Sequence, residues 1–240
     1  MGRAFEVRKQ AMAKTAAAKT RIYSKYGREV YMAAKGNPDP EINVDLKRVI
    51  ERAKKDQVPN DIIKRALEKA KGGVDENYAL ARYEGFGPGN SLFIVECLTD
   101  NVNRTISEVR NCFTKSNSKL GVSGSVSHMF LYQSVFAIKD AKEDEILEII
   151  IENDINVTDI EEDEQGVSIY GEAVDYNKIK QALLAVNPNF EFVTDEIMWV
   201  PQTEVTLTNE EDISMFEKLT QMLDELDDVK DVYHNVNVSD

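Results

Sequence analysis

The fold is decided by residues 135–170, which read VFAIKDAKEDEILEIIIENDINVTDIEEDEQGVSIY. Short apolar and β-branched runs here flank one helix-forming run rich in Glu and Ile, so the stretch predicts strand, helix, strand, strand. The predicted elements up to residue 200 are strands at 135–138, 156–160, 166–170 and 190–200, and helices at 143–153 and 174–185. The order βαββαβ is typical of a ferredoxin-like domain, which we expect over residues 133–200.

Two incomplete sets of elements flank this domain. The preceding set has strands at 78–83, 91–98 and 125–132 and a helix at 104–115, and the following set has strands at 204–207 and 229–238 and a helix at 210–226. A tail of about 40 residues rarely carries its own core. We therefore expect residues 76–132 and 201–240 to form one two-layer α+β domain into which residues 133–200 are inserted. Three sequential domains are the alternative.

The N-terminal part is predicted to be helical. Residues 5–35 contain no proline and only one glycine, and residues 41–55 and 60–71 carry apolar side chains at helical spacing. Gly72 and Gly73 end the third helix. The predicted class is α+β with three domains: an all-α N-terminal helical domain (1–75) plus two ferredoxin-like α+β domains, one inserted into the other.

The charge of the chain is unevenly divided. Its 240 residues include 29 Lys plus Arg and 43 Asp plus Glu, a net charge of −14, which taken alone disfavours a nucleic-acid partner. However, residues 1–72 carry +9, residues 73–132 carry −1 and residues 133–240 carry −22. We expect the basic domain to face phosphate, and the acidic part to face away from it or to contact a basic protein.

Composition and residue spacing exclude several other classes of protein. The sequence has no apolar run of membrane-spanning length and no signal-peptide core at its start, so we expect a cytoplasmic protein with no membrane partner. Cys97 and Cys112 lack the spacing of a disulfide framework or a thiolate zinc site. The two histidines, His128 and His234, stand near no nucleophile pattern. We therefore expect no enzyme activity, no cofactor and no metal.

The first candidate binding surface is one face of the opening helix. At about 100° per residue its bases fall within a stripe roughly 80° wide, opposite an apolar face. This pattern predicts contact with nucleic-acid phosphates, although a merely solvated helix face and a membrane-surface helix are alternatives. The stripe consists of Lys14, Arg21, Lys25, Arg28 and Lys35.

The second candidate is a glycine-rich loop between two predicted strands. Gly85, Gly87, Pro88 and Gly89 lie within five residues, a composition typical of a shaped turn with left-handed backbone positions. Such a loop can let a backbone approach a ligand closely, or it can be a tight connector with Phe86 in the core. It is neither a P-loop nor a dinucleotide fingerprint.

The third candidate runs from a strand end into a helix start and reads TDNVNRT at residues 99–105. Asn101 and Asn103 are natural helix caps, which is the simpler interpretation. Free amides at a helix start also bind anions, and Arg104 would then lie beside them. A second glycine-rich segment follows at residues 121–126.

These segments together resemble the YebC/PmpR family, which includes mitochondrial translational activators of cytochrome c oxidase. The family pattern Y-E-G-aromatic-G-P appears at residues 83–88, T-D-N-x-N-R-T at 99–105 and L-G-x-x-G-S-V at 120–126. The pattern A-K-x-x-x-x-P, followed by Asn or Lys and an acid, appears at residues 53–61. The family's S-K-W-A-N-I opening is absent, and residues 3–8 read RAFEVR instead.

The resemblance implies a cytoplasmic gene-expression protein with a helical N-terminal domain and two α+β domains. Members have been described as DNA-binding transcriptional regulators, and others resemble ribosome-associated factors that relieve stalling on proline-rich stretches. The sequence leaves both open, with DNA or rRNA as the partner, beside a third hypothesis of an adaptor that contacts only proteins. No helix-turn-helix with base-reading side chains is recognisable, so binding is expected to be backbone-led and salt-sensitive.

Overall fold

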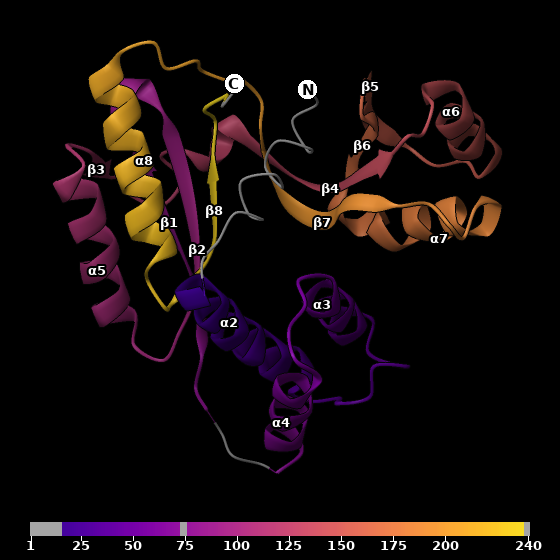
Figure 1. Cartoon of the computed structure of the whole chain (residues 1–240), viewed down its shortest axis with the longest axis horizontal. Coiled ribbons are helices and arrows are strands. Elements are labelled where there is room, and N and C mark those ends of the chain that lie inside the picture. Colours follow the sequence, from indigo (N-terminus) through magenta and orange to yellow (C-terminus); the bar gives the residue numbers. More distant parts are fainter. Residues whose placement is uncertain (1–15, 73–75, 238–240) are drawn as a thin grey trace. The chain divides into compact units, whose positions relative to one another are not determined.

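The computed structural model describes residues 16–72 and 76–237, with the side chains of the first helix described from Lys19 onward. Contacts divide the chain into two compact units. One contains Ser127–Leu207 together with the segment that begins at Asn235, and the other contains the helical region, residues 76–126 and Thr208–His234. Figure 1 draws both.

The first unit has the predicted βαββαβ order. Its strands are β4 (Phe130–Lys139), β5 (Val157–Asp163), β6 (Gly166–Glu172) and β7 (Phe192–Pro201), and its helices are α6 (Glu143–Glu152) and α7 (Tyr176–Val186). The antiparallel sheet has the order β5-β6-β4-β7, so each helix connects two strands that are separated by one other strand. Both helices bury aliphatic side chains against the strands, including Ile146, Ile179 and Leu183. The ferredoxin-like prediction for this part of the chain is confirmed.

The strand predictions at the entrance to this unit were wrong in detail. The sequence pattern places one strand at 125–132 and another at 135–138, whereas β4 is a single strand that pairs with β7 from Phe130 to Ile138. The apparent break lies at Gln133 and Ser134, which are polar but buried within the sheet. The Ser134 hydroxyl donates a hydrogen bond to the carbonyl of Glu172 at 3.1 Å. The expected domain boundary at 132/133 thus falls inside β4, and the three-domain division stays a prediction.

The second unit combines the helical region with a second four-stranded antiparallel sheet, in the order β3-β1-β2-β8. Its strands are β1 (Ala79–Phe86), β2 (Leu92–Thr99), β3 (Lys119–Leu120) and β8 (Val229–His234), and α5 (Val102–Lys115) and α8 (Glu210–Asp224) pack beside each other on it. A short 3-10 turn, η1 (Pro88–Asn90), connects β1 to β2. The elements follow one another as β-β-α-β-α-β.

Aromatic side chains from segments that are distant in the sequence form the core between this sheet and the helices α5 and α8. Phe93 of β2 contacts Phe113 of α5 and Phe216 of α8, with ring centroids 5.9 and 5.6 Å apart. The third strand of this sheet is β3, because residues 125–129 make no strand; Ser127–Met129 form a 3-10 turn. The expected strand at 204–207 is reduced to one bridge between Val205 and Val236, in the first unit.

The helical region, here called the head (residues 16–72), consists of α2 (Ala16–Ala34), α3 (Val44–Lys55) and α4 (Asn60–Lys71). The second helix begins later than residue 41 because Asn43 caps it, accepting the Leu46 N–H at 3.0 Å. Its core includes Val30, Leu46 and Ala53, each at most 1% exposed. The expected helical residues 5–15 lie outside the described part of the chain. The predicted α+β class with a helical N-terminal region is confirmed.

Candidate nucleic-acid interface

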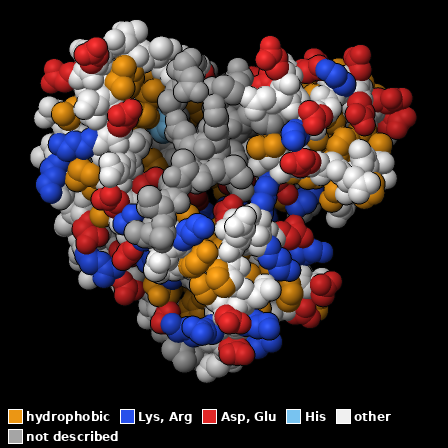
Figure 2. All heavy atoms as spheres, in the orientation of Figure 1, with side chains coloured by type: hydrophobic (Ala, Val, Ile, Leu, Met, Phe, Trp, Pro, Cys, Tyr) orange, Lys and Arg blue, Asp and Glu red, His pale blue; other side chains and the backbone are white. Residues whose placement is uncertain are grey.

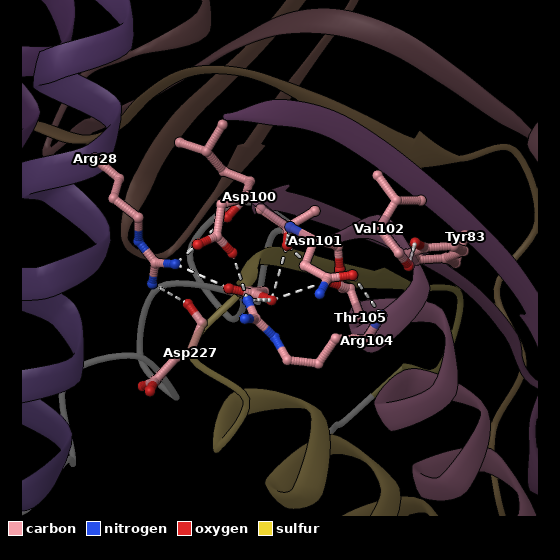
Figure 3. A network of polar contacts seen from close by, with 11 residues as sticks. Arg28, Tyr83, Asp100, Asn101, Val102, Arg104, Thr105 and Asp227 are labelled. Carbon is pink, nitrogen blue, oxygen red and sulfur yellow. Dashed lines mark hydrogen bonds and ion pairs between the residues drawn. The ribbon is translucent and has the colours of Figure 1, made fainter. Parts of the chain in front are cut away.

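A buried carboxylate, Asp228, joins three segments of the second unit. It lies in the turn between α8 and β8 and is 4% exposed. Its Oδ2 accepts hydrogen bonds from the hydroxyls of Thr99 at 2.9 Å and Thr105 at 2.8 Å, and from Arg104 Nη2 at 2.6 Å. Its Oδ1 accepts one from Arg28 Nη1 at 3.0 Å. In Figure 3, Arg28 approaches from α2 and Arg104 from the start of α5.

The segment TDNVNRT folds around this carboxylate through its own local bonds. Asn101 caps α5 by accepting the Arg104 N–H at 3.1 Å. Thr99 accepts the N–H of Asn101 at 2.9 Å, which turns the chain sharply between β2 and α5. Arg104 also pairs with Asp100 at 2.8 Å. The segment therefore has a structural task, which is to present two hydroxyls and a guanidinium to Asp228.

These donors keep Asp228 ionised. Burial raises the pKa of the Asp228 carboxyl, but hydrogen bonds from Arg104, Thr105 and Thr99 outweigh burial and bring that pKa below its usual range. Hydrogen bonds to Asp228 and Asp100 raise the pKa of Arg104. Both groups are therefore charged at any pH near neutrality, and Arg28 is attached to a permanent anion.

A second group of charges lies where α2 and α3 meet β8. Arg52 pairs with Glu29, and Lys230 pairs with Asp231 at 2.7 Å. Burial raises the pKa of Asp231, but Lys230 and Arg52 bring it down to about 2. Arg52 and Lys230 are thus occupied by internal acids and are not surface cations.

A second buried carboxylate, Glu84 of β1, organises the two glycine-rich segments. It is 2% exposed. Its carboxylate accepts the backbone N–H groups of Gly124 at 2.9 Å and Val126 at 2.7 Å, and its carbonyl accepts the Gly121 N–H at 2.7 Å. The loop at 121–126 is consequently attached to β1 through one side chain, and the two family patterns that contain these residues form one structural feature.

Close packing explains the glycines of the first loop. A Cβ on Gly85 would lie 2.3 Å from Phe113, and one on Gly87 would lie 2.4 Å from Phe93. Gly89 has φ 59° within η1, and Pro88 before it is buried. These positions fit the connector interpretation of the loop. Phe86 is not in the core, however: it is 41% exposed, because it points away from the face on which its neighbour Gly85 meets α5.

The structure separates the residues predicted to contact phosphate. The two arginines of the Asp228 network, Arg28 and Arg104, are engaged within the protein. Arg21 and Lys25 are half-buried on α2, and Lys35 is exposed just beyond its end. Lys14 lies outside the described residues. Asn103 is exposed, and its carbonyl accepts the Ser107 hydroxyl at 2.8 Å.

The most accessible bases of the head lie outside the stripe predicted on α2. Six Lys and Arg side chains of the head are exposed and form no ion pair with another described residue. Most stand on α3 and α4, and Figure 2 shows Lys and Arg side chains around α4 at the bottom of the view, with single acidic side chains between them. We call this set the exposed head bases: Lys19, Lys47, Lys54, Lys64, Arg65 and Lys71. A signal was present, since Lys47 and Lys54, like Lys64 and Lys71, are seven residues apart.

No group of three or more His, Cys, Asp or Glu side chains among residues 16–72 and 76–237 is arranged to hold a metal ion. Over the same residues, no helix has the length and apolar character needed to cross a membrane.

Comparison with known proteins places the chain in a family. Residues 3–73 match the TACO1/YebC protein N-terminal domain, and residues 78–236 match the TACO1/YebC second and third domain. A probable transcriptional regulatory protein of Alteromonas mediterranea is 55% identical over 98% of both chains. One of the same description from Acholeplasma laidlawii is 58% identical, also over 98% of both. The crystal structure of a conserved hypothetical protein, Aq1575 from Aquifex aeolicus, superposes with a TM-score of 0.80 at 34% identity, covering 95% of this chain and 94% of that one. The chain belongs to the TACO1/YebC family.

Proposed function

We propose that this protein is a non-enzymatic regulator of gene expression that binds nucleic acid, with DNA as its target and the exposed head bases as its phosphate-binding surface. Its relatives carry the description probable transcriptional regulatory protein, which supports the regulatory role. The observation that carries the proposal is that these six bases stand in solvent without an ion pair to a described residue.

The contrast with the internal bases strengthens this assignment. Arg28 and Arg52 each have a buried acidic partner, so their charge is neutralised where it stands. Lys54 and Lys64 have none among the described residues, and both project from a surface that α2 does not cover. Unpaired lysines gain most from phosphate, because binding releases condensed counterions without breaking an internal pair.

Binding of this kind should be governed by charge and salt. Each lysine that contacts a phosphate contributes about 0.9 to the slope of log K against log salt on duplex DNA. The double variant Lys54→Gln, Lys64→Gln should therefore make the slope shallower by about 2. The matched control is Lys142→Gln, Lys178→Gln, which removes two exposed lysines from the acidic unit. Equal slopes for the two double variants would overturn the assignment of the surface.

The target is tested by crosslinking the protein in cells and sequencing the attached nucleic acid at a stated ionic strength. Recovery of promoter DNA that is lost in the Lys54→Gln, Lys64→Gln variant supports the proposal. Recovery of ribosomal RNA in its place would make the protein a ribosome-associated translation factor, and recovery of protein alone would make it an adaptor.

A further inference from the structure

An exposed aromatic ring lies at the C-terminal end of β1. Phe86 is 41% exposed and lies directly opposite Lys119 of β3 in the antiparallel register. Directly opposed residues point to the same face of a sheet, so the ring and the lysine are neighbours. Arg82 lies four residues before Phe86 on the same strand and projects on that face as well. Between them Glu84 shares this face and pairs with Arg82 at 3.9 Å, so Lys119 is the cation beside the ring.

The glycine-rich loop at 121–126 borders this ring. A Cβ on Gly121 would lie 3.2 Å from Cε2 of Phe86, so the loop backbone runs beside the ring edge. Val122, Ser123 and Gly124 are exposed beyond it. Glu84 holds the loop in this place through the N–H groups of Gly124 and Val126. The surface is thus preorganised by a buried side chain.

The charge next to the ring is positive. Lys119 is its direct neighbour, and the nearest acid on the same face of β1, Glu84, is buried, accepts hydrogen bonds from the loop at 121–126 and pairs with Arg82. Lys119 is exposed and has no ion pair with another described residue. On the opposite side, α8 packs against η1 and begins with three acids. An anionic ligand would accordingly approach from the β3 side.

We propose that Phe86, Lys119 and the loop at 121–125 bind an unpaired nucleotide of a single-stranded nucleic acid. The base stacks on the Phe86 ring, Lys119 meets the adjoining phosphate, and the glycine loop leaves room for the sugar. Stacking on an exposed aromatic ring beside basic side chains is how single strands are held without sequence preference. A duplex hides its base faces and would not fit this surface. The inference rests on the proposed function and adds a second contact to the head.

The test uses a single-stranded RNA that carries 2-aminopurine, whose fluorescence falls when its base stacks. The full-length protein should quench this fluorescence, and Phe86→Leu should abolish the quenching and weaken binding by about 5- to 150-fold. Phe86→Tyr should retain both, because it keeps the ring. Leu80→Ala is the matched control, since Leu80 is an exposed apolar residue at the other end of β1, 76% exposed. Comparing the affinity for a single-stranded DNA of the same sequence shows whether the protein distinguishes ribose from deoxyribose.

The outcomes separate this inference from the proposed function. Head variants such as Lys54→Gln, Lys64→Gln should weaken duplex and single strand alike and leave the quenching at saturation unchanged. If they do so while Phe86→Leu binds and quenches as the unaltered protein does, the stacking site is wrong and the head surface stands. If Phe86→Leu weakens binding to duplex DNA equally, Phe86 does not read unpaired bases. If the unaltered protein binds no nucleic acid at all, both proposals fall.

Discussion

Replacing Asp228 by Asn should loosen the attachment of α2 to the sheet. The amide keeps one oxygen for the two threonines, but its NH2 group then faces Arg28, which can only donate hydrogen bonds. The Arg28 and Asp228 side chains are 15% and 5% exposed, so the variant leaves a nearly buried guanidinium without its counter-ion. Removing one partner of a buried pair costs about 3–5 kcal/mol.

The lower end of that range applies here. Asn has the shape of Asp and retains part of the hydrogen bonding, and Arg104 is solvent-exposed, so water takes over the screening of its charge. We expect the free energy of unfolding to fall by about 3 kcal/mol. For a chain of this length, a loss of that size lowers Tm by roughly 6–12 °C.

The assay is thermal and urea unfolding, with hydrogen exchange of the α2 amides as a local measurement. Asp227→Asn is the matched control, because it removes the same charge one residue earlier from an exposed side chain. Only the carbonyl of Asp227 contacts Arg28, and the substitution retains it. If both variants melt within about 1 °C of each other, Asp228 does not hold α2 in place.

The same variant has a predicted pH dependence. The folded-state pKa of Asp228 is lowered, so its stabilising contribution is complete above the unfolded-state pKa of about 3.9 and is lost as pH falls through the folded-state pKa. The difference in unfolding free energy between the unaltered protein and Asp228→Asn should be constant from pH 8 to about 5 and should close below about pH 4. A difference that grows on acidification would reverse the assigned sign.

Three further predictions concern packing and access. Gly85→Ala should destabilise the protein by about 1–3 kcal/mol, because its Cβ would lie 2.3 Å from Phe113. Gly27→Ala in α2, where the nearest atom would be 3.5 Å away, should stabilise it by about 0.5–1 kcal/mol. Equal effects of the two variants in urea unfolding would contradict this packing difference. Glu84→Gln should speed the exchange of the Gly124 and Val126 amides, since one of them would face an NH2 group, and unchanged exchange would show that the loop holds itself. A thiol reagent at pH 8 should label neither buried cysteine until denaturant is added, because both thiols are inaccessible and burial raises the pKa of Cys97 to about 12. Rapid labelling of the folded protein would contradict this prediction.

Periodicity predicted the elements where one face of a strand or helix is apolar. The ferredoxin-like order of residues 133–200 and the three head helices follow from this signal. It failed at β4, because Gln133 and Ser134 are polar residues whose backbone is satisfied on both sides by neighbouring strands. It also failed at β3, where two residues are too short a run to show alternation.

The candidate site was less predictable for a different reason. The local pattern of Thr99 through Thr105 predicts a helix start, and the structure has one there. The acid that these residues surround, however, lies far away in the sequence, at position 228. Nothing in the sequence marks Asp228 above Asp227 before it, since the two differ only in burial. Charge–charge partners separated by more than a hundred residues become visible only when the sheet brings β2 and β8 together.

Arg28 shows what this means for the binding surface. A stripe of bases on a helix predicts phosphate contact only if no acid from elsewhere occupies it, and Asp228 occupies Arg28. Arg28→Gln should therefore lower Tm and leave the salt slope of DNA binding unchanged. Lys54→Gln, on an exposed side chain without an ion pair to a described residue, should leave Tm unchanged and make the slope shallower by about 1. The reverse outcome, a slope that responds to Arg28 and not to Lys54, would mean that the α2 stripe releases Asp228 to bind phosphate, and that the surface inferred from the sequence is the functional one.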